Sequence, residues 1–182
     1  MTSIAAAGRD PAAGPKYLSW PDIEKQVESI ARGVATDGYP QAVVGVVRGG
    51  LVPAVMAAHR LGVRDVRALE VTHTVDDAVD AVKTAGPQIR NPASLGALPG
   101  LDVLVVEDVA GTGETLEAVA DLVRQAGAAR VRTAVLVVNE ANWTRGRPPA
   151  ETVNHIGVTV RGWVVFPWEG AAAGPATGGE AA

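Results

Sequence analysis

The sequence predicts an α/β fold built around a parallel sheet, because strand and helix patterns alternate along it, and its length and cysteine count limit the alternatives. Apolar runs typical of strands that are buried on both faces alternate with helical patterns along the chain. The chain has 182 residues, of which 47% are hydrophobic, so it suffices for about one domain with a core of its own. It has no cysteine, which excludes a disulfide scaffold, a thiol nucleophile and a cysteine-ligated metal.

Helices and strands are expected in alternation from Ser19 onward. Ser19 is a suitable N-cap for the first helix, because Pro21 fits the first helical turn and Asp22 stands where a capping carboxylate belongs. This helix is expected to run to about Thr36. The other expected helices cover residues 51–61 and 115–126, and the expected strands cover residues 42–47, 67–72, 102–106, 131–138 and 163–166.

Residues 73–100 interrupt this alternation. They carry scattered charges together with Gly-Pro, Asn-Pro and Pro-Gly pairs, which predict a long mobile loop with one short helix near residues 77–83. Loops of this length in compact domains are usually functional or disordered. The Ala-, Gly- and Pro-rich ends, residues 1–14 and 170–182, are expected to be disordered tails around one domain over residues 15–169.

Charge and hydropathy exclude several classes of partner. The formal net charge is −4, whereas nucleic-acid binding requires a concentrated basic face. No apolar run reaches the roughly 18 residues of a membrane span, and the N-terminus lacks the pattern of a signal peptide. We therefore expect a cytoplasmic protein that binds neither nucleic acid nor membrane. The three histidines show no metal-ligand spacing, and only His73 lies near the candidate site described next, as a candidate proton carrier.

The richest segment covers residues 105–116, where a buried strand ends in Glu107 and Asp108. A loop of small and hydroxyl residues follows, and then a helix whose N-terminus favours an anion. Gly111 and Gly113 allow the backbone to wrap closely around such a ligand. Two carboxylates would repel a phosphate, but they would accept hydrogen bonds from sugar hydroxyls. The segment therefore predicts a ribose 5-phosphate site at the carboxyl ends of the strands, where ligands bind in such sheets.

Three other interpretations fit parts of this segment. A Walker P-loop requires a lysine, which is absent here, and Glu114 stands close to its place. A Rossmann fingerprint requires a third glycine, but Leu116 occupies that position and carboxylates precede the loop. An ordinary strand end followed by a helix cap stays open from the spacing alone.

The same segment resembles a known signature. Residues 103–116 resemble the phosphoribosyl pyrophosphate (PRPP) motif of type I phosphoribosyltransferases, and residues 46–54 resemble their pyrophosphate loop. Residues 163–169 resemble the nucleobase-covering segment of bacterial xanthine–guanine and archaeal purine phosphoribosyltransferases. The resemblance spans about residues 17–169. It implies a doubly wound, mostly parallel sheet with a small C-terminal hood, formed by the N-terminal segment and about residues 140–169.

The resemblance implies an enzyme that transfers the 5-phosphoribosyl group of PRPP to a nitrogen of a purine-like base. Pyrophosphate is released and a nucleoside 5′-monophosphate is formed. Mg²⁺ would be bound mainly by PRPP, with Asp108 as its contact on the protein, and the enzyme would be a homodimer or homotetramer. The implied site residues are Glu107 and Asp108 for catalysis and the ribose hydroxyls; Ala110, Gly111, Thr112, Gly113, Glu114 and Thr115 for the 5-phosphate; Arg48 and Gly49 for pyrophosphate; and Asn139, Trp163 and Val164 for the nucleobase.

The pyrophosphate end of the site carries further expectations from the family. The peptide bond before the residue that matches Arg48 is often cis there. The loop at residues 73–100 would close over the reacting centre and exclude water. Lys83 and Arg90 in that loop are candidate pyrophosphate contacts.

Aromatic residues define the expected nucleobase end. Trp163 would stack on a purine-like ring while the backbone of Val164 reads its edge. Phe166 and Trp168 are expected to pack within the hood instead. Trp143 and the basic segment 145–147 would border the base or an oligomer contact, and an exposed arginine pair is the alternative that fits the segment best.

Two residues depart from the family pattern at the nucleobase end. Gly111 stands where the family usually has an Asp that faces N7 of the purine and handles its proton, and Asn139 stands where a Lys is common. One interpretation is an ordinary purine enzyme that uses water or another group as the base. The other is an unusual acceptor, for example a 7-substituted 7-deazapurine such as 7-cyano-7-deazaguanine in nucleoside-antibiotic biosynthesis, because Gly111 would leave space beside that ring position.

A second functional class stays open. Some relatives of these enzymes bind PRPP and act as regulators without turnover. Such regulators usually carry an added DNA-binding domain or a basic face, and neither is evident in this sequence.

Overall fold

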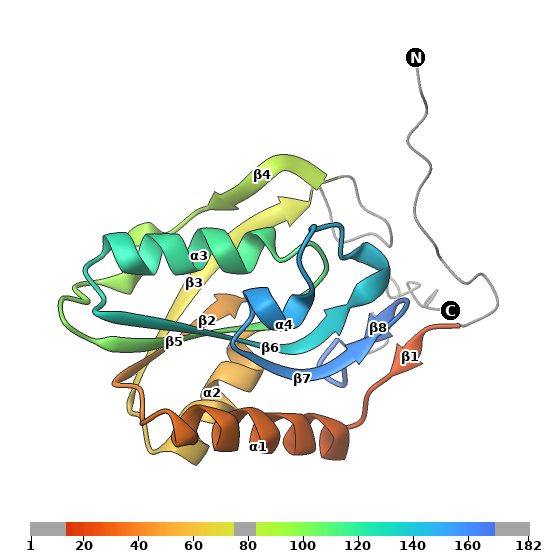
Figure 1. Ribbon diagram of the computed structural model, residues 1–182, viewed down its shortest axis with the longest axis horizontal. Helices are drawn as coiled ribbons and strands as arrows, with labels where there is room; N and C mark the ends of the chain where they lie inside the picture. Colours follow the sequence, from red (N-terminus) through yellow and green to blue (C-terminus); the bar gives the residue numbers. More distant parts are fainter. Residues whose placement is uncertain (1–13, 75–82, 170–182) are drawn as a thin grey trace, which may run out of the picture.

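The computed structural model describes residues 14–74 and 83–169. Its centre is a six-stranded sheet in the order β4-β3-β2-β5-β6-β7 (Figure 1). Neighbouring strands are parallel, except that β3 and β4 are antiparallel. The strands are β2 (Ala42–Val47), β3 (Asp65–Thr74), β4 (Lys83–Ile89), β5 (Asp102–Ala110), β6 (Arg130–Asn139) and β7 (His155–Val160). The expected tails, apart from Gly14, and nearly all of the short helix expected near 77–83 lie outside the described residues.

Helices cover both faces of this sheet, as a doubly wound fold requires. Figure 1 places α1 (Trp20–Thr36) and α2 (Leu51–Leu61) below the sheet and α3 (Glu114–Gln125) above it. The side chains of β5 alternate between the two apolar layers. Leu104 and Val106 pack with α1 and α2, and Val103 and Val105 pack with α3. This alternation explains why the strand sequence is apolar without interruption.

The helix ends confirm the signals expected from the sequence. Ser19 and Asp22 form a reciprocal capping box at the start of α1. Gly62 ends α2 in the left-handed conformation, with φ of 69°. Three shorter helical segments complete the chain: η1 (Pro92–Leu95), η2 (Glu140–Asn142) and α4 (Pro149–Thr152). None of the helices in the described residues is long and apolar enough to cross a membrane.

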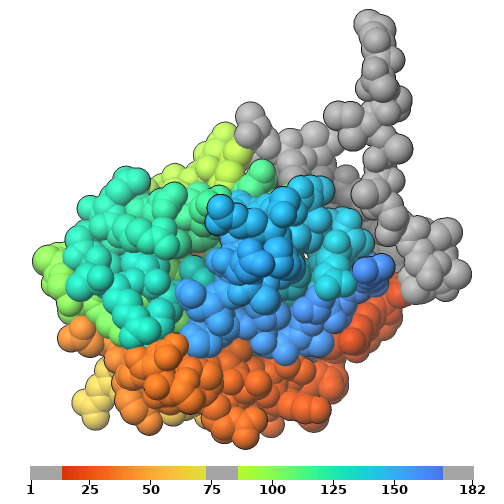
Figure 2. Space-filling model, in the orientation of Figure 1, coloured from red at the N-terminus to blue at the C-terminus, as the bar shows by residue number. Residues whose placement is uncertain are grey.

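Residues from the two ends of the domain meet in a second, smaller sheet. There β1 (Lys16–Tyr17) pairs in parallel with β8 (Val164–Val165), and Figure 2 shows these segments side by side at one end of the molecule. Phe166 stacks on Trp168 with ring centroids 4.6 Å apart, and Trp168 lies 5.9 Å from Trp20. The packing role expected for Phe166 and Trp168 is therefore confirmed.

The expected loop at 73–100 is wrong over much of its length. β3 runs to Thr74, β4 pairs with it, and η1 follows. Asn91 fastens this segment to β3, because its side-chain oxygen accepts from the amide of Glu70 at 2.6 Å. The Gly86-Pro87 pair suggested a turn, but a strand at the edge of a sheet has one unpaired side and tolerates proline there.

Two further strands differ from the expectation. No strand was expected between residues 138 and 163, yet β7 pairs with β6 over most of its length. β5 continues beyond the expected end at Val106 as far as Ala110. Glu107 and Asp108 therefore lie on the strand itself, rather than in the loop after it.

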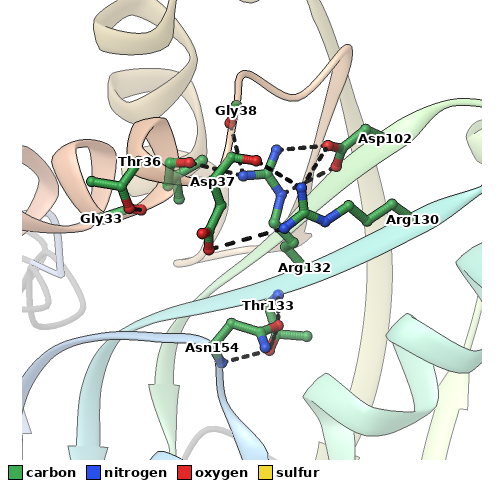
Figure 3. Close-up of polar contacts among 10 residues, drawn as sticks. Gly33, Thr36, Asp37, Gly38, Asp102, Arg130, Arg132, Thr133 and Asn154 are labelled. Atoms are coloured by element: carbon green, nitrogen blue, oxygen red, sulfur yellow. Dashed lines mark hydrogen bonds and ion pairs between the residues drawn. The ribbon is translucent and has the colours of Figure 1, made fainter.

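A buried ion pair fixes the far end of the sheet, away from the carboxyl ends of the parallel strands. Arg132 is buried and donates to both carboxylate oxygens of Asp102 at 3.1 and 2.9 Å (Figure 3). It also donates to the backbone oxygens of Val34 and Gly38, both at 2.9 Å. Arg132 thereby satisfies carbonyl groups at the end of α1 and ties that helix to β5 and β6.

Candidate active site

A cavity of about 270 Å³ opens at the carboxyl ends of β5 and β6. The loop after β5 forms one wall, and the hood forms the opposite wall. The cavity is lined by Glu107, Val109, Ala110, Gly111, Thr112, Gly113, Thr115, Asn139, Asn142, Gly162, Trp163, Val164, Phe166 and Glu169. The segments expected to bind the 5-phosphate and the nucleobase therefore share one cavity.

The two acids expected to hold the ribose face different surroundings. Successive side chains of a strand point to opposite faces, and Glu107 and Asp108 are neighbours on β5. Glu107 is buried, with 7% of its surface exposed, and lines the cavity. Asp108 is half-buried and lies against Gly49, since a Cβ at position 49 would overlap its carboxylate. Asp108 thus faces the turn after β2 rather than the cavity wall.

That turn is the expected pyrophosphate loop, and it packs tightly on β5. The Val47–Arg48 peptide bond is cis, as the resemblance implies. A Cβ at Gly50 would lie 2.7 Å from the backbone oxygen of Val46 and 2.9 Å from Cα of Glu107. Only glycine allows so close an approach, so the Gly49-Gly50 pair brings the turn against the acidic end of β5.

The loop between β5 and α3 presents backbone amides at a helix N-terminus. Gly113 is the N-cap of α3 and adopts the left-handed conformation, with φ of 72°. The Glu114 amide in this turn donates to the hydroxyl of Thr112 at 3.5 Å, and a helix N-terminus of this kind favours an anion. Glu114 does not line the cavity in the described structure; its carboxylate accepts from the hydroxyl of Thr112 at 3.0 Å.

Asn139 joins the two segments that form the nucleobase end. Its Oδ1 accepts from the amide of Ala141 at 3.1 Å and from the amide of Gly162 at 3.2 Å. Trp163 follows Gly162, is 40% exposed and lines the cavity, whereas Val164 is buried. The carboxamide of Asn139 therefore links η2 to the segment that carries Trp163.

Asn142 is the nearest neighbour of Gly111 on the side where a side chain at position 111 would begin. A Cβ at position 111 would lie 3.3 Å from Cβ of Asn142 and 3.8 Å from its Nδ2. Asn142 lines the same cavity. A neutral carboxamide thus stands beside the position where the family usually has an acid.

Burial perturbs the carboxylate of Asp108. Removal from water raises its pKa to about 6, and the negative charge of Glu169 adds to the rise. Hydrogen bonds from nearby backbone amides oppose this shift without cancelling it. Glu169 lines the cavity, and its Oε2 accepts from the amide of Phe166 at 2.8 Å. The hood therefore brings a second acid close to the acidic end of β5.

Other candidates lie along the β3–β4 edge. The Nε group of Arg90 donates to the hydroxyl of Thr72 at 3.2 Å, which holds this arginine beside β3. His73 lies in β3 and Lys83 begins β4. Lys83 and Arg90 were expected in a mobile loop. In the structure Lys83 is the first residue of β4 and Arg90 directly follows its last residue.

Two cavity residues, Asn142 and Glu169, were not named individually from the sequence, and two residues that were named there contact the loop after β5. Asn142 follows the carboxyl end of β6, a position where ligands bind in such sheets, and this is the one signal that marked it. Glu169 ends the segment that resembles the nucleobase-covering motif, but nothing in the sequence connects it with Asp108. Trp143 and Arg145 contact the loop after β5, since a Cβ at Gly113 would lie 3.0 Å from the Trp143 ring and Arg145 donates to the backbone oxygen of Thr112.

Comparison with known proteins agrees with this arrangement. The family described as "Phosphoribosyl transferase domain" matches residues 15–171. The chain is 29% identical over 159 residues to the xanthine-guanine phosphoribosyltransferase of Ruegeria sp. (strain TM1040), covering 84% of each chain. It is 31% identical over 164 residues to the enzyme of the same name from Cereibacter sphaeroides (strain ATCC 17025 / ATH 2.4.3), covering 84% of this chain and 86% of the relative.

A solved structure agrees as well. The purine phosphoribosyltransferase from Pyrococcus horikoshii Ot3 superposes with a TM-score of 0.67 at 30% sequence identity, covering 85% of this chain and 93% of that one. The family match over residues 15–171 includes the sheet, the loop after β5 and the hood. The chain therefore belongs to the phosphoribosyl transferase domain family and is a type I phosphoribosyltransferase related to the purine enzymes.

Proposed function

We propose that this enzyme transfers the 5-phosphoribosyl group of PRPP to a nitrogen of a purine-like base, with release of pyrophosphate. One observation carries the proposal: a single cavity joins the amide-rich loop after β5 and Glu107 to the exposed ring of Trp163. A sugar phosphate and a flat base would then lie side by side. Bringing both reactants together in one orientation is itself a large part of catalysis.

The acidic end of β5 would hold the ribose. Glu107 and Asp108 accept hydrogen bonds from the 2- and 3-hydroxyls. Glu107 does so from the cavity side of β5, and Asp108 from the side of Gly49. The departure of pyrophosphate leaves positive charge on the ribosyl ring, and the two carboxylates favour that charge. The raised pKa of Asp108 supports this role, because a carboxyl group that burial keeps out of water gains most from a cationic neighbour.

The two glycine-containing turns would hold the phosphates. Residues 110–115 bind the 5-phosphate through backbone amides at the N-terminus of α3. Arg48 and Gly49 bind the pyrophosphate group, on the side of β5 where Asp108 lies. The bond that forms joins the base nitrogen to C1 of the ribose, and the bond that breaks joins C1 to the pyrophosphate oxygen. The proton of that ring nitrogen passes to water.

Mg²⁺ is the metal that this reaction would use. It supplies charge neutralisation for the leaving pyrophosphate. The carboxylate of Asp108 suits it, because Mg²⁺ prefers oxygen ligands and binds through one or two carboxylates together with substrate phosphates. The described residues contain no group of three or more acidic or histidine side chains that could hold a metal ion. We propose that Mg²⁺ enters with PRPP and contacts Asp108 beside Gly49.

The acceptor base is the finer part of the proposal. Trp163 stacks on the ring, and the backbone of Val164 reads its edge. Because Gly111 and Asn142 provide no acid, we propose an acceptor from which no proton is taken at ring position 7, such as a 7-substituted 7-deazapurine. The carboxamide of Asn142 would hydrogen-bond a substituent there, and its position limits how large that substituent is.

A panel of nucleobases tests this proposal. The enzyme is incubated with PRPP and Mg²⁺ and with guanine, hypoxanthine, xanthine or 7-cyano-7-deazaguanine, and pyrophosphate release is measured. We expect turnover, with the 7-cyano base preferred. Faster reaction of guanine, hypoxanthine or xanthine would contradict the proposal of an unusual acceptor base, and it would still support the proposal of phosphoribosyl transfer.

The same assay separates the enzyme from a PRPP-binding regulator without turnover. Tight PRPP binding by calorimetry with no pyrophosphate release for any base would favour the regulator. A cytoplasmic location stays a prediction from the charge and hydropathy of the sequence. A homodimer or homotetramer stays a prediction from the family resemblance, and analytical ultracentrifugation of the full chain measures this oligomeric state.

A further inference from the structure

The segment after η2 contacts the outer side of the loop that would bind the 5-phosphate. Arg145 donates from Nε to the backbone oxygen of Thr112 at 2.6 Å. The same guanidinium pairs with the carboxylate of Glu117 on α3, also at 2.6 Å. Arg145 is 21% exposed and Glu117 is 58% exposed. One arginine side chain therefore links the loop to the first turns of the helix that follows it.

The geometry of the peptide bond gives this contact a consequence inside the cavity. The C=O and N–H groups of one trans peptide unit lie in a plane and point in opposite directions. The oxygen of Thr112 and the amide of Gly113 belong to the same unit. Since Arg145 holds the oxygen on the outer side, the amide of Gly113 is directed to the other side. Thr112 and Gly113 both line the cavity, so the direction of this amide matters for an anion bound there.

Trp143 supports the same peptide unit. Its ring packs over Gly113, because a Cβ at that position would lie 3.0 Å from Cη2 of the ring. The Nε1 group of Trp143 donates to the backbone oxygen of Arg147 at 2.8 Å, which closes residues 143–147 into a compact turn. The ring and the guanidinium thus hold the loop from the outside at two adjacent residues.

The charge of the pair fits an anion site. The guanidinium of Arg145 is the largest cause of a lowered pKa at Glu117, so the two side chains are both charged near neutral pH. Hydrogen bonds between charged groups are stronger and more directional than neutral ones. The ion pair therefore orients the guanidinium, and the guanidinium orients the loop.

We propose that Arg145 is a positioning residue for the 5-phosphate of the substrate: it fixes the Thr112–Gly113 peptide unit so that the Gly113 amide faces the phosphate. This inference rests on the proposed function, because it takes the loop after β5 as the 5-phosphate site. It assigns the side chains of Trp143 and Arg145 to the support of the 5-phosphate loop, rather than to the nucleobase or an oligomer contact.

The test compares two ligands that occupy different ends of PRPP. Binding of ribose 5-phosphate and of pyrophosphate with Mg²⁺ is measured by calorimetry on the full chain. The variants are Arg145→Gln, Arg145→Lys and the control Arg147→Ala, which removes an exposed side chain whose residue contributes only its backbone oxygen to Trp143. We expect Arg145→Gln to weaken ribose 5-phosphate binding about tenfold and pyrophosphate binding less than about twofold, with Arg145→Lys between. Arg147→Ala should match the wild type.

Steady-state kinetics give a second readout. KM for PRPP should rise in Arg145→Gln while kcat changes less, because an interaction made equally in the ground and transition states affects binding alone. Equal binding of ribose 5-phosphate by the variant and the wild type would overturn the inference. An equal loss for both ligands would overturn it too, since that pattern indicates a general effect on the fold. A wild type that binds neither ligand would overturn the proposed function and the inference with it, and the wild-type titration alone identifies that case.

Discussion

The carboxylate of Asp108 lies against the backbone of Gly49, at the place where a side chain at position 49 would begin. The turn after β2 and the acidic end of β5 are thereby in contact, although they are far apart in the sequence. The contact brings the candidate pyrophosphate loop beside the carboxylate proposed to touch Mg²⁺. A methyl group at position 49 can be accommodated only if the acid or the turn moves.

Gly49→Ala should therefore impair catalysis. We expect kcat/KM for PRPP to fall about 100-fold, because a displacement of about 1 Å among reacting groups has an effect of that size. Steady-state pyrophosphate release measures it. Gly86→Ala is the matched control, since its Cβ would meet nothing within 4 Å, and it should keep wild-type kinetics. Wild-type kinetics in Gly49→Ala would contradict the contact.

The pH dependence of activity should report Asp108. Burial raises the pKa of Asp108 to about 6, with help from Glu169. If the ionised form binds ribose and Mg²⁺, kcat/KM for PRPP rises as the pH increases through about 6, and it falls below that value. Glu169→Gln removes one cause of the raised pKa, so the rise should begin at lower pH. An acidic limb that is the same in Glu169→Gln and wild type would show that another group titrates.

The same shift makes a prediction about stability. The pKa of Asp108 is higher in the folded chain than its ordinary value of 3.8, so the contribution of this group to stability is fully present below that value and is lost as the pH rises through about 6. Asp108→Asn should then raise the free energy of unfolding at pH 7.5 by about 3 kcal/mol, because each pKa unit corresponds to about 1.4 kcal/mol, while it impairs PRPP binding. Urea denaturation at pH 3.5 and pH 7.5 measures this, and an equal effect of the substitution at both pH values would refute it.

Gly111 and Asn142 should act together on the choice of base. An Asp at position 111 would press on Asn142, because its Cβ would lie 3.3 Å from Cβ of Asn142. We expect Gly111→Asp to reduce kcat/KM for 7-cyano-7-deazaguanine more than for guanine, by about tenfold in the ratio. The double variant Gly111→Asp with Asn142→Gly relieves the contact and should regain part of the loss. A ratio unchanged by Gly111→Asp would exclude position 111 from base selection.

Arg132 should matter for stability and not for chemistry. Replacing it with Met leaves Asp102 without its two hydrogen bonds from Arg132 and frees the carbonyls of Val34 and Gly38. The loss should be about 3 kcal/mol in the free energy of unfolding, with kcat/KM unchanged at 25 °C. Arg124→Met is the control, because its ion pair with Asp121 is more than half exposed and should contribute less than about 1 kcal/mol. Equal losses in the two variants would contradict the account.

The central part of the fold could be predicted because its signals are local. β2, β5 and β6 are buried on both faces, so each has an apolar run that needs no knowledge of its neighbours. The edge strands β4 and β7 lack that signal, since each has a neighbour on one side only. Their identity depends on hydrogen bonds to β3 and β6, which no local pattern in the sequence reports.

The candidate site divides in the same way. Glu107, Gly111 and their neighbours form one continuous motif, so the resemblance to a family signature could single them out along the chain. Asn142 and Arg145 act across contacts with residues about thirty positions away, and a single sequence contains no record of such pairs. The position of Asp108 against Gly49 is of the same kind, because it depends on how two parallel strands end side by side.

The central claim is that the acids at the carboxyl end of β5 bind the ribose of PRPP, while the loop after β5 binds its 5-phosphate. A crystal structure of the enzyme with PRPP and Mg²⁺ tests this most directly. The account predicts the 5-phosphate within hydrogen-bond distance of the amides of residues 111–115, and the ribose hydroxyls on the carboxylates of Glu107 and Asp108. A sugar bound elsewhere, or ribose hydroxyls that contact neither acid, would contradict it.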